Sequence, residues 1–396
     1  MISDRRIFVT GHGSVSPLDN SFPAETDFYD ELLETSLVAD DCAQPTRPIR
    51  ELHADRYIAH DQLRRVDRLT QMAMISAQKA LASAQFSIDR QNEERTGIIF
   101  NNCFGPLQST ETYVSKLIRE GSKRAPAGLF PYTVVSVLTG LVTMKTKALG
   151  TNSTVSGSNS VCYGLDAIRQ GTDDVMLVGG CDEITASLTS WFRHAGYFGA
   201  ASDDAGQPDS GARPRSSFLF GEGAATLVLE ESASMQRRGS QPLAEVLDYG
   251  CVHPLRSPHP YHLTPESIEA AMLKALSYSG VQPRQIGLIV SGANGLPQLN
   301  HAEDAAVAKL FCTSNPPPAI RVKDYIGETL GSSGVFAVIA AAEALHRRRL
   351  PAVASHERVA NSSTPATLDA EYALVNCYEF GGNINSIVVK RHESIN

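Results

Sequence analysis

The sequence has 396 residues, of which 42% are hydrophobic and 20% are charged, and its formal net charge is −8. A chain of this length can bury a large core without disulfide bonds or metal ions to hold it together. The acidic balance and the lack of a long Lys/Arg run argue against nucleic acid or an anionic membrane as the main partner.

The seven cysteines are scattered and contain no Cys-x-x-Cys pair, so they predict neither a disulfide framework nor a zinc site. The opening MISDRRIFVTG does not resemble a signal peptide. The longest largely apolar stretch, Gly334–Leu345, has about 12 residues, whereas a membrane span needs about 20. We therefore expect a soluble cytoplasmic protein with no metal and no cofactor.

Short continuous apolar runs, typical of strands covered on both faces, occur in two series. The first series is Arg6–Gly11, Thr96–Asn101, Asp174–Gly180 and Ala224–Glu230, and the second is Pro242–Tyr249, Ile286–Gly292, Ala319–Lys323 and Ser386–Lys390. Helical spacing of apolar residues is found in Arg68–Ala82, Thr264–Leu276, Asn300–Phe311 and Gly334–Leu345, with Thr264 as an expected N-cap before Pro265. The polar stretch Glu231–Gln241 separates the two series. This pattern predicts two similar α/β halves, residues 1–235 and 236–396.

The common cofactor and hydrolase motifs fail. No Gly-x-x-x-x-Gly-Lys-Ser/Thr or His-Glu-x-x-His is present. Gly221-Glu222-Gly223 begins like a dinucleotide turn, but Thr226 stands at the third glycine. Ser158 lies in SGSNS, which lacks the glycine spacing of a hydrolase elbow.

Five separated segments, in order along the chain, instead resemble the β-ketoacyl-acyl-carrier-protein synthase family. They are Phe8–Pro17 (FVTGHGSVSP), Phe130–Gly150 (the family's Asn-Pro-Tyr helix), Arg213-Pro214 with Gly221–Ala224 (GEGA), Lys323–Gly334 (KDYIGETLGSSG) and Glu379–Asn385 (EFGGNIN, for the family's Phe-Gly-Phe-Gly-Gly-x-Asn). The resemblance implies a thiolase-like fold of two duplicated α/β halves in a five-layered α-β-α-β-α core.

The resemblance also implies which groups a condensing enzyme needs. In this family a cysteine thiolate, whose pKa is lowered at a helix N-terminus, accepts the acyl chain. Two histidines then support loss of CO₂ and the enolate oxygen that develops. In this sequence Asn294 stands at the first histidine and Glu328 at the second, while the family lysine is retained as Lys323.

The family's nucleophilic cysteine can be located in this sequence by counting residues from either of two matching segments. Neither count gives a cysteine. Counting forward from Gly150 gives Asn159, and counting back from the helix segment GLDAI gives Val161. Cys162 is one residue beyond the second count, and a neighbouring residue on a helix points about 100° away. We expect Cys162 to be a small buried core residue, with a live nucleophile as the alternative.

A family member without its catalytic groups resembles the chain-length factor, or ketosynthase β, of type II polyketide systems. That resemblance implies a non-condensing subunit that forms a heterodimer, or a heterotetramer, with a catalytic ketosynthase and is visited by an acyl carrier protein. The residues expected to line a shared chain tunnel are Thr133, Val135, Ser136, Phe380, Gly381 and Gly382. The alternatives are an active synthase or other acyltransferase that uses Cys162, and a purely structural partner.

Two further clusters have simpler interpretations. His301, Glu303 and Asp304 could bind a metal ion, but a solvated helix start is the favoured interpretation. The arginines at 347–349 could dock an acidic carrier protein, or could end a helix.

Overall fold

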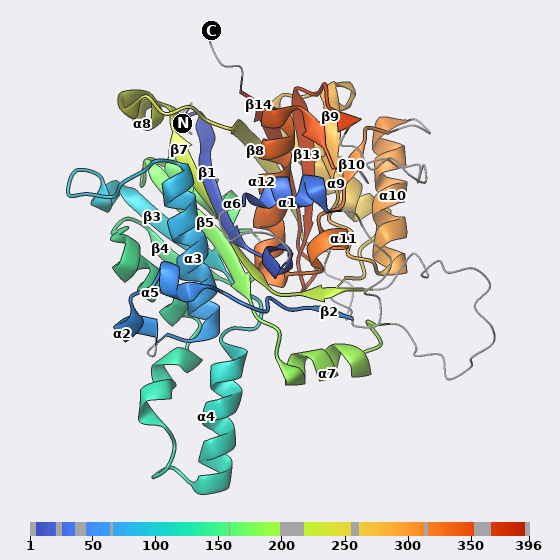
Figure 1. Ribbon diagram of the computed structural model, residues 1–396. Coiled ribbons are helices and arrows are strands. Elements are labelled where there is room, and N and C mark those ends of the chain that lie inside the picture. The colour runs from blue at the N-terminus through green and yellow to red at the C-terminus, as the bar shows by residue number, and fades with distance from the viewer. Residues whose placement is uncertain are drawn as a thin grey trace, which may run out of the picture.

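The computed structural model describes the chain at residues 5–20, 26–35, 45–63, 66–157, 159–198, 218–254, 261–312, 316–351 and 366–392. Within these ranges ten strands form one mixed sheet in the order β10-β9-β13-β14-β8-β1-β7-β5-β3-β4 (Figure 1). The strands are β1 (Ile7–Val15), β3 (Thr96–Asn101), β4 (Asn152–Val155), β5 (Val175–Asp182), β7 (Gly223–Glu231), β8 (Ala244–Val252), β9 (Ile286–Val290), β10 (Ala319–Ile320), β13 (Tyr372–Tyr378) and β14 (Ile384–Arg391).

The strand arrangement is the same in the two halves of the sheet. In the first half β4, β3 and β5 pair in parallel, and β7 and β1 continue antiparallel. In the second half β10, β9 and β13 pair in parallel, and β14 and β8 continue antiparallel. The halves join where β1 pairs with β8, and there Ile7 lies opposite Val246. This repeat confirms the two duplicated α/β halves.

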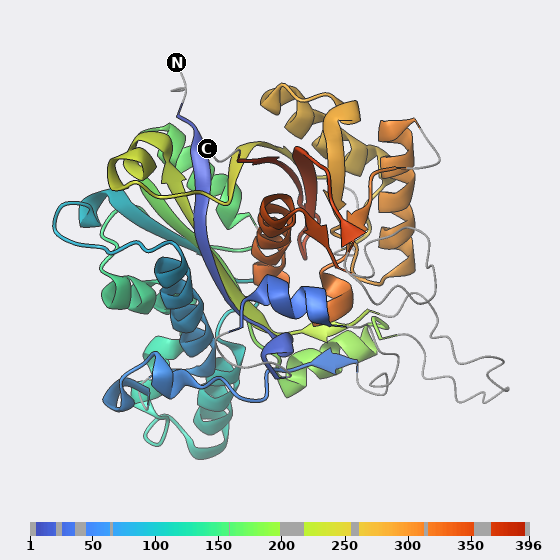
Figure 2. The same cartoon turned by 45° about the horizontal axis from the view of Figure 1, so that its top comes forward.

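Helices lie between the two half-sheets and on both outer faces (Figure 2). The central layer holds α6 (Ser160–Arg169) and α12 (Ser333–Arg347), the first outer layer α3 (Arg68–Ser83) and α5 (Ser136–Thr146), and the second outer layer α9 (Pro265–Ser279) and α10 (Pro297–Phe311). Every residue of α12 from Ser333 to Leu345 is buried, as a helix covered by sheets on two sides requires. The expected five-layered, thiolase-like fold is therefore confirmed.

Shorter elements connect these layers. They are α1 (Phe28–Glu34), α2 (His60–Leu63), α4 (Leu107–Glu120), α7 (Ala186–His194), α8 (Ser232–Arg238), α11 (Lys323–Ile326), η1 (Pro17–Asn20), η3 (Ala54–Arg56), η4 (Glu93–Arg95), η5 (Ala127–Thr133), η6 (Pro283–Gln285), η7 (Leu330–Ser332), β2 (Thr46–Arg47), β6 (Phe220–Gly221), β11 (Arg349–Leu350) and β12 (Ala366–Thr367). Figure 1 shows α4 projecting from the body of the molecule.

The start of α9 shows how the sequence sets an element boundary. The hydroxyl of Thr264 accepts the N–H of Ser267, and the hydroxyl of Ser267 accepts the N–H of Thr264, which forms a capping box. Pro265 occupies the first helical turn, and Gly280 ends the helix at a φ of 66°. The predicted N-cap at Thr264 is confirmed.

Two predicted elements differ from the structure. The helix expected from Phe130 begins instead at Ser136, because Pro131 lies in the 3-10 turn η5 and disfavours an α conformation at Phe130. The strand expected over Ala319–Lys323 ends at Ile320, and Lys323 opens α11.

The membrane-spanning potential of the described helices is low. None of them is by itself long and apolar enough to cross a membrane. By length and composition, only η5 and α5 taken together pass such a test, and they are bent by 95°.

Candidate functional site

Loops from both halves of the fold meet beside the N-terminal ends of α6 and α12. These two helices follow β4 and β10, which hold the same place in their half-sheets. Asn294 follows β9, Glu328 lies between α11 and α12, and Asn159 immediately precedes α6. The duplicated topology therefore places side chains from distant parts of the sequence around one position.

Glu328 is the centre of a buried polar cluster. Its side chain is 1% exposed. Its Oε2 accepts Asn294 Nδ2 at 3.1 Å and Lys323 Nζ at 2.8 Å. Its Oε1 accepts the N–H of Leu330 at 3.1 Å and the hydroxyl of Ser333 at 2.6 Å. Four donors directed at the two oxygens fit an ionised carboxylate, which accepts at both oxygens and donates at neither.

A second buried carboxylate, Asp182, holds the Glu328 loop against the first half of the fold. It accepts the N–H of Gly331 at 2.8 Å, of Cys103 at 3.0 Å and of Phe104 at 3.2 Å. Burial raises the pKa of Asp182 to about 7, although these backbone donors oppose the shift. Glycine is required at 331, because a Cβ there would lie 2.7 Å from the Asp182 carboxylate.

The start of α6 distinguishes between the two nucleophile counts. The helix begins at Ser160, so Asn159 lies at its N-terminus, whereas Val161 is 1% exposed in the central core. Of the two candidates, Asn159 thus lies at the helix N-terminus and Val161 in the core. Cys162 is 4% exposed, and burial, with further contributions from nearby thiols and carboxylates, raises its pKa well above the ordinary value. Such a thiol is a poor nucleophile.

The cluster holds an amide and a carboxylate where the family resemblance places the two histidines of decarboxylative condensation. That reaction requires a thiolate and donors that stabilise a developing enolate oxygen. Here the amide of Asn294 donates to Glu328, and Glu328 presents negative charge. An ionised carboxylate at this position would repel an enolate. These bonds hold the loop of Glu328 in place.

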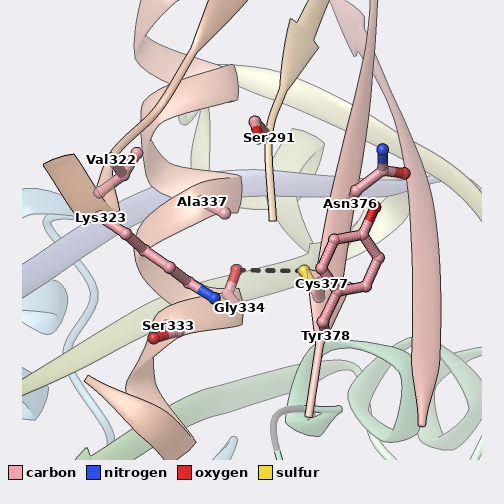
Figure 3. Close-up of a pocket in the computed structure, with 9 residues that line it drawn as sticks. All are labelled: Ser291, Val322, Lys323, Ser333, Gly334, Ala337, Asn376, Cys377 and Tyr378. Carbon is pink, nitrogen blue, oxygen red and sulfur yellow. Dashed lines mark hydrogen bonds between the residues drawn. The ribbon is translucent and has the colours of Figure 1, made fainter. Parts of the chain in front are cut away.

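The space beside Lys323 is small (Figure 3). A cavity of about 10 Å³ is lined by Ser291, Val322, Lys323, Ser333, Gly334, Ala337, Asn376, Cys377 and Tyr378. This volume suits a single water molecule. Cys377 Sγ lies 4.0 Å from the carbonyl oxygen of Gly334, and burial raises its pKa to about 12 despite the charge of Lys323. The cavity has no room for an acyl chain.

The residues predicted to line a tunnel come from two segments of the chain. Thr133, Val135 and Ser136 lie beside the start of α5, and Phe380, Gly381 and Gly382 follow β13. Val135 packs against Gly105, in the loop before α4. A Cβ added at Gly105 would lie only 3.0 Å from Val135 Cγ2. The adjacent Phe104 ring lies 5.1 Å from that of Phe380. The loop of Phe104 and Gly105 therefore packs against both segments and links them.

Phe380 also belongs to an aromatic cluster that spans α7 and the loops around it. Its rings are Phe104, Trp191, Phe192, Tyr197, Phe198, Phe218, Phe220, Tyr261 and Phe380. Trp191, the single tryptophan of the sequence, is 46% exposed and lies 5.8 Å from Phe380. Burial and the charge of Glu328 raise the pKa of Tyr261 well above its ordinary value. The aromatic cluster therefore extends to the Glu328 site.

One group of side chains has the composition of a metal site. His12 Nε2 lies 2.7 Å from Glu343 Oε1 and 3.5 Å from Asp27 Oδ2. Arg347 binds the other oxygen of each carboxylate and also pairs with Asp30. The guanidinium offsets part of the negative charge there, so the group has the features of a structural ion-pair network. Arg347, the first of the three arginines, is thus half-buried in this network.

The His301–Asp304 cluster differs from its prediction. His301 and Asp304 are exposed on α10, but Glu303 is buried and therefore does not lie in a solvated helix start. Glu303 accepts the N–H groups of Gly292 and Ala293 and so holds the loop that carries Asn294. Its position inside α10 explains the difference, because α10 already begins at Pro297.

Two site residues had no role in the sequence-based prediction. Asp182 directly follows a buried apolar run, where a polar residue often marks a functional strand end. Glu379 is 3% exposed and precedes Phe380. It opens the segment Glu379–Asn385, which resembles the family's C-terminal motif, and is the charged residue of that segment. Both signals were present in the sequence. Arg213, Pro214 and Ser158 lie outside the described residues.

Comparisons with known proteins agree with the fold. The family described as "Beta-ketoacyl synthase, N-terminal domain" matches residues 4–234, and "Beta-ketoacyl synthase, C-terminal domain" matches residues 243–357. A 3-oxoacyl-[acyl-carrier-protein] synthase 2 of Staphylococcus aureus (strain COL) is 24% identical over the whole of both chains. The corresponding Vibrio cholerae protein is 25% identical and covers 98% of this chain and 100% of its own.

Two solved structures share this fold. One is described as "The ishigamide ketosynthase/chain length factor", with a TM-score of 0.82, 23% identity and coverage of 99% of this chain and 100% of its own. The other is a type II PKS acyl-carrier protein in complex with its ketosynthase bound to the hexaketide, with a TM-score of 0.79, 17% identity and the same coverage. Given the family match over more than half of its length, the chain belongs to the β-ketoacyl synthase family.

Proposed function

We propose that this chain is a non-condensing subunit that pairs with a catalytic ketosynthase and helps to set the length of the product. The observation that carries the proposal is the bonding of Glu328. Asn294 and Glu328, which stand where the family resemblance places two histidines, bond to each other, and Glu328 also pairs with Lys323. No imidazole is present at either position to support decarboxylation, and Asn159 supplies no thiol.

A partner surface is supported by exposed apolar side chains near the free edge of the sheet. β4 is the last strand of the sheet and pairs with β3. The adjoining elements α4, η5 and α5 expose large hydrophobic residues, namely Val114, Ile118, Phe130, Val134, Val135 and Met144. A strand edge and an apolar surface of this kind favour association with a second chain. The proposed partner is a catalytic ketosynthase subunit in a heterodimer or heterotetramer.

An influence on chain length is supported by the position of Val135. This side chain is 43% exposed, so a partner subunit could approach it, and it packs on Gly105 beside the aromatic cluster. Bulk added to a close-packed wall excludes added atoms of a growing chain. In the proposal Thr133, Val135 and Ser136 form part of the shared tunnel wall, together with Phe380, Gly381 and Gly382.

The proposal includes an acyl carrier protein that delivers the chain. A related structure contains a carrier protein with its ketosynthase, which supports this part of the proposal by similarity. A cytoplasmic location is supported by the cysteines, because the six in the described residues are unpaired.

Two alternatives remain to be tested. An active acyltransferase would use Cys162, but the burial and raised pKa of this thiol argue against it. The curated relatives are named as synthases, so the activity of the isolated chain must be measured. A purely structural partner would stabilise the ketosynthase without affecting product length.

The first experiment tests the isolated chain. The purified protein should not decarboxylate malonyl-acyl-carrier protein, and mass spectrometry should find no acyl adduct on Cys162. A stoichiometric acyl adduct, or decarboxylation above the protein-free background, would reject the non-condensing role.

The second experiment tests the complex. The chain is co-expressed with an intact ketosynthase, and Val135→Phe or Ser136→Phe should shorten the product, because the added ring fills space that the chain would occupy. Leu273→Phe is the matched control, since Leu273 is 47% exposed on the outer helix α9. A complex that forms normally but makes an unchanged product would favour the structural alternative.

A further inference from the structure

A buried negative charge lies next to the start of α6. Glu379 is 3% exposed. Asn385 Nδ2 donates to its Oε1 at 2.8 Å, and Asn383 Nδ2 donates to its Oε2 at 2.9 Å. The backbone N–H of Glu379 also donates to the carbonyl of Asn383. The turn between β13 and β14 thus folds around this carboxylate and fixes its position.

The carboxylate is directed at the loop that leads into α6. A Cβ at Gly157 would lie 2.7 Å from Glu379 Cδ, so the side chain packs against the Gly157 backbone. Gly157 is two residues before Asn159, which immediately precedes α6 and is one of the two positions that the family resemblance allows for the nucleophile. The family motif Phe-Gly-Phe-Gly-Gly-x-Asn begins with uncharged residues, so Glu379, at the start of the matching segment, adds a carboxylate that the motif lacks there.

The electrostatic influence of Glu379 extends to the thiols around it. Its charge contributes to the raised pKa values of Cys103, Cys162 and Cys251, in each case after the larger effect of burial. A helix N-terminus lowers a thiol pKa because its unpaired N–H groups favour negative charge. A fixed carboxylate beside the same N-terminus acts in the opposite direction.

We infer that Glu379 makes the nucleophile position of this chain unfavourable for a thiolate by fixing a buried carboxylate beside the N-terminus of α6. The inference deepens the proposed non-condensing function, on which it rests. The inference adds a second difference from the family at the nucleophile position, the Glu379 carboxylate, to the missing cysteine. A thiol restored at residue 159 would remain mostly protonated, and therefore poorly reactive, until the charge at residue 379 is removed.

The test introduces a thiol and measures its ionisation in the full-length chain. The pH dependence of iodoacetamide alkylation is followed in Asn159→Cys and in Asn159→Cys/Glu379→Gln. Tandem mass spectrometry of the tryptic peptide separates an adduct at residue 159 from one at Cys162. We expect the midpoint of alkylation at residue 159 to fall by about one pH unit or more when Glu379 is replaced.

The matched control is Asn159→Cys/Glu245→Gln. Glu245 is also a buried carboxylate, 6% exposed, but it lies opposite Lys390 near the end of β14, where Arg6 donates to both of its oxygens. Glu379 lies just before the start of β14. This control should leave the midpoint unchanged. Equal midpoints with Gln and Glu at residue 379 would overturn the inference, and so would a folded double variant whose residue 159 stays unreactive at every pH.

A native thiol provides a second measurement that needs no change at residue 159. Glu379→Gln alone should lower the pH at which Cys103 is alkylated, because the charge of Glu379 helps to raise its pKa. An unchanged Cys103 profile in the folded variant would also count against the inference. The proposed function has a separate criterion, since it fails when the wild-type chain is acylated and not when these midpoints coincide.

Discussion

Lys323→Met removes one partner of the buried Lys323–Glu328 pair, and its effect can be worked out from the contacts. The substitution deletes the Nζ donor at 2.8 Å and leaves the carboxylate with Asn294, Leu330 and Ser333 as donors. A buried carboxylate without its counter-ion is costly, and breaking such pairs typically lowers stability by about 3–5 kcal/mol.

The double variant Lys323→Met/Glu328→Gln separates the cost of the unpaired charge from lost packing. A neutral amide at residue 328 still accepts the bonds of Leu330 and Ser333 and needs no counter-ion. Replacing a buried pair by neutral groups is often close to neutral in stability. We therefore expect the double variant to regain about 2 kcal/mol or more of the loss, which is a clear departure from additivity.

The assay is urea unfolding, followed by far-UV circular dichroism and by the fluorescence of Trp191. Coincident transitions show whether a two-state free energy of unfolding is justified. A loss below about 1 kcal/mol in Lys323→Met, or a double variant that is no more stable than the single one, would refute the description of Glu328 as an ionised, paired carboxylate.

Two further substitutions test the buried network and the Glu379 contact. Burial acts to lower the pKa of His12, but its bond to Glu343 and the charge of Glu343 raise that pKa above its ordinary value. Burial acts to raise the pKa of Glu343, but the bond to His12 and the charges of His12 and Arg347 lower it to about 2. The stabilisation is full between about pH 4.5 and 6.5 and is lost as the pH rises through the folded pKa of His12 or falls toward that of Glu343. His12→Leu should therefore lose most stability in that window, and a loss independent of pH in urea unfolding would contradict this reasoning. Gly157→Ala should lower stability by about 2 kcal/mol or more in the same assay, because φ is +121° and the added Cβ meets Glu379. An effect near zero would place that carboxylate elsewhere.

Most strands could be predicted because burial on both faces leaves continuous apolar runs in the sequence. β3 matches its predicted bounds, Thr96–Asn101. β13 (Tyr372–Tyr378) was missed, because Asn376 interrupts its apolar run although this side chain is buried. β4 lies outside the strands predicted from apolar runs, because an edge strand of sequence NSTV is partly exposed and carries no such run.

The candidate site was predictable only in part. Motif matching identified Asn294, Glu328 and Lys323, and the structure brings these three together. The hydrogen bonds among these side chains could not be predicted from the sequence, because the bond between Asn294 and Glu328 joins loops 34 residues apart. The count at residues 159–161 stayed open for the same reason. It depends on where a helix begins, and that boundary is set by tertiary packing.

The single tryptophan has a practical consequence. Trp191 is partly exposed, and its indole ring lies 5.8 Å from Phe380, one of the residues assigned to the tunnel. Intrinsic emission excited at the red edge of protein absorbance therefore originates from one known place in this chain. A carrier protein, a fatty thioester or a second subunit that comes near this place would change the intensity or the colour of that emission, so binding could be titrated without attaching a dye.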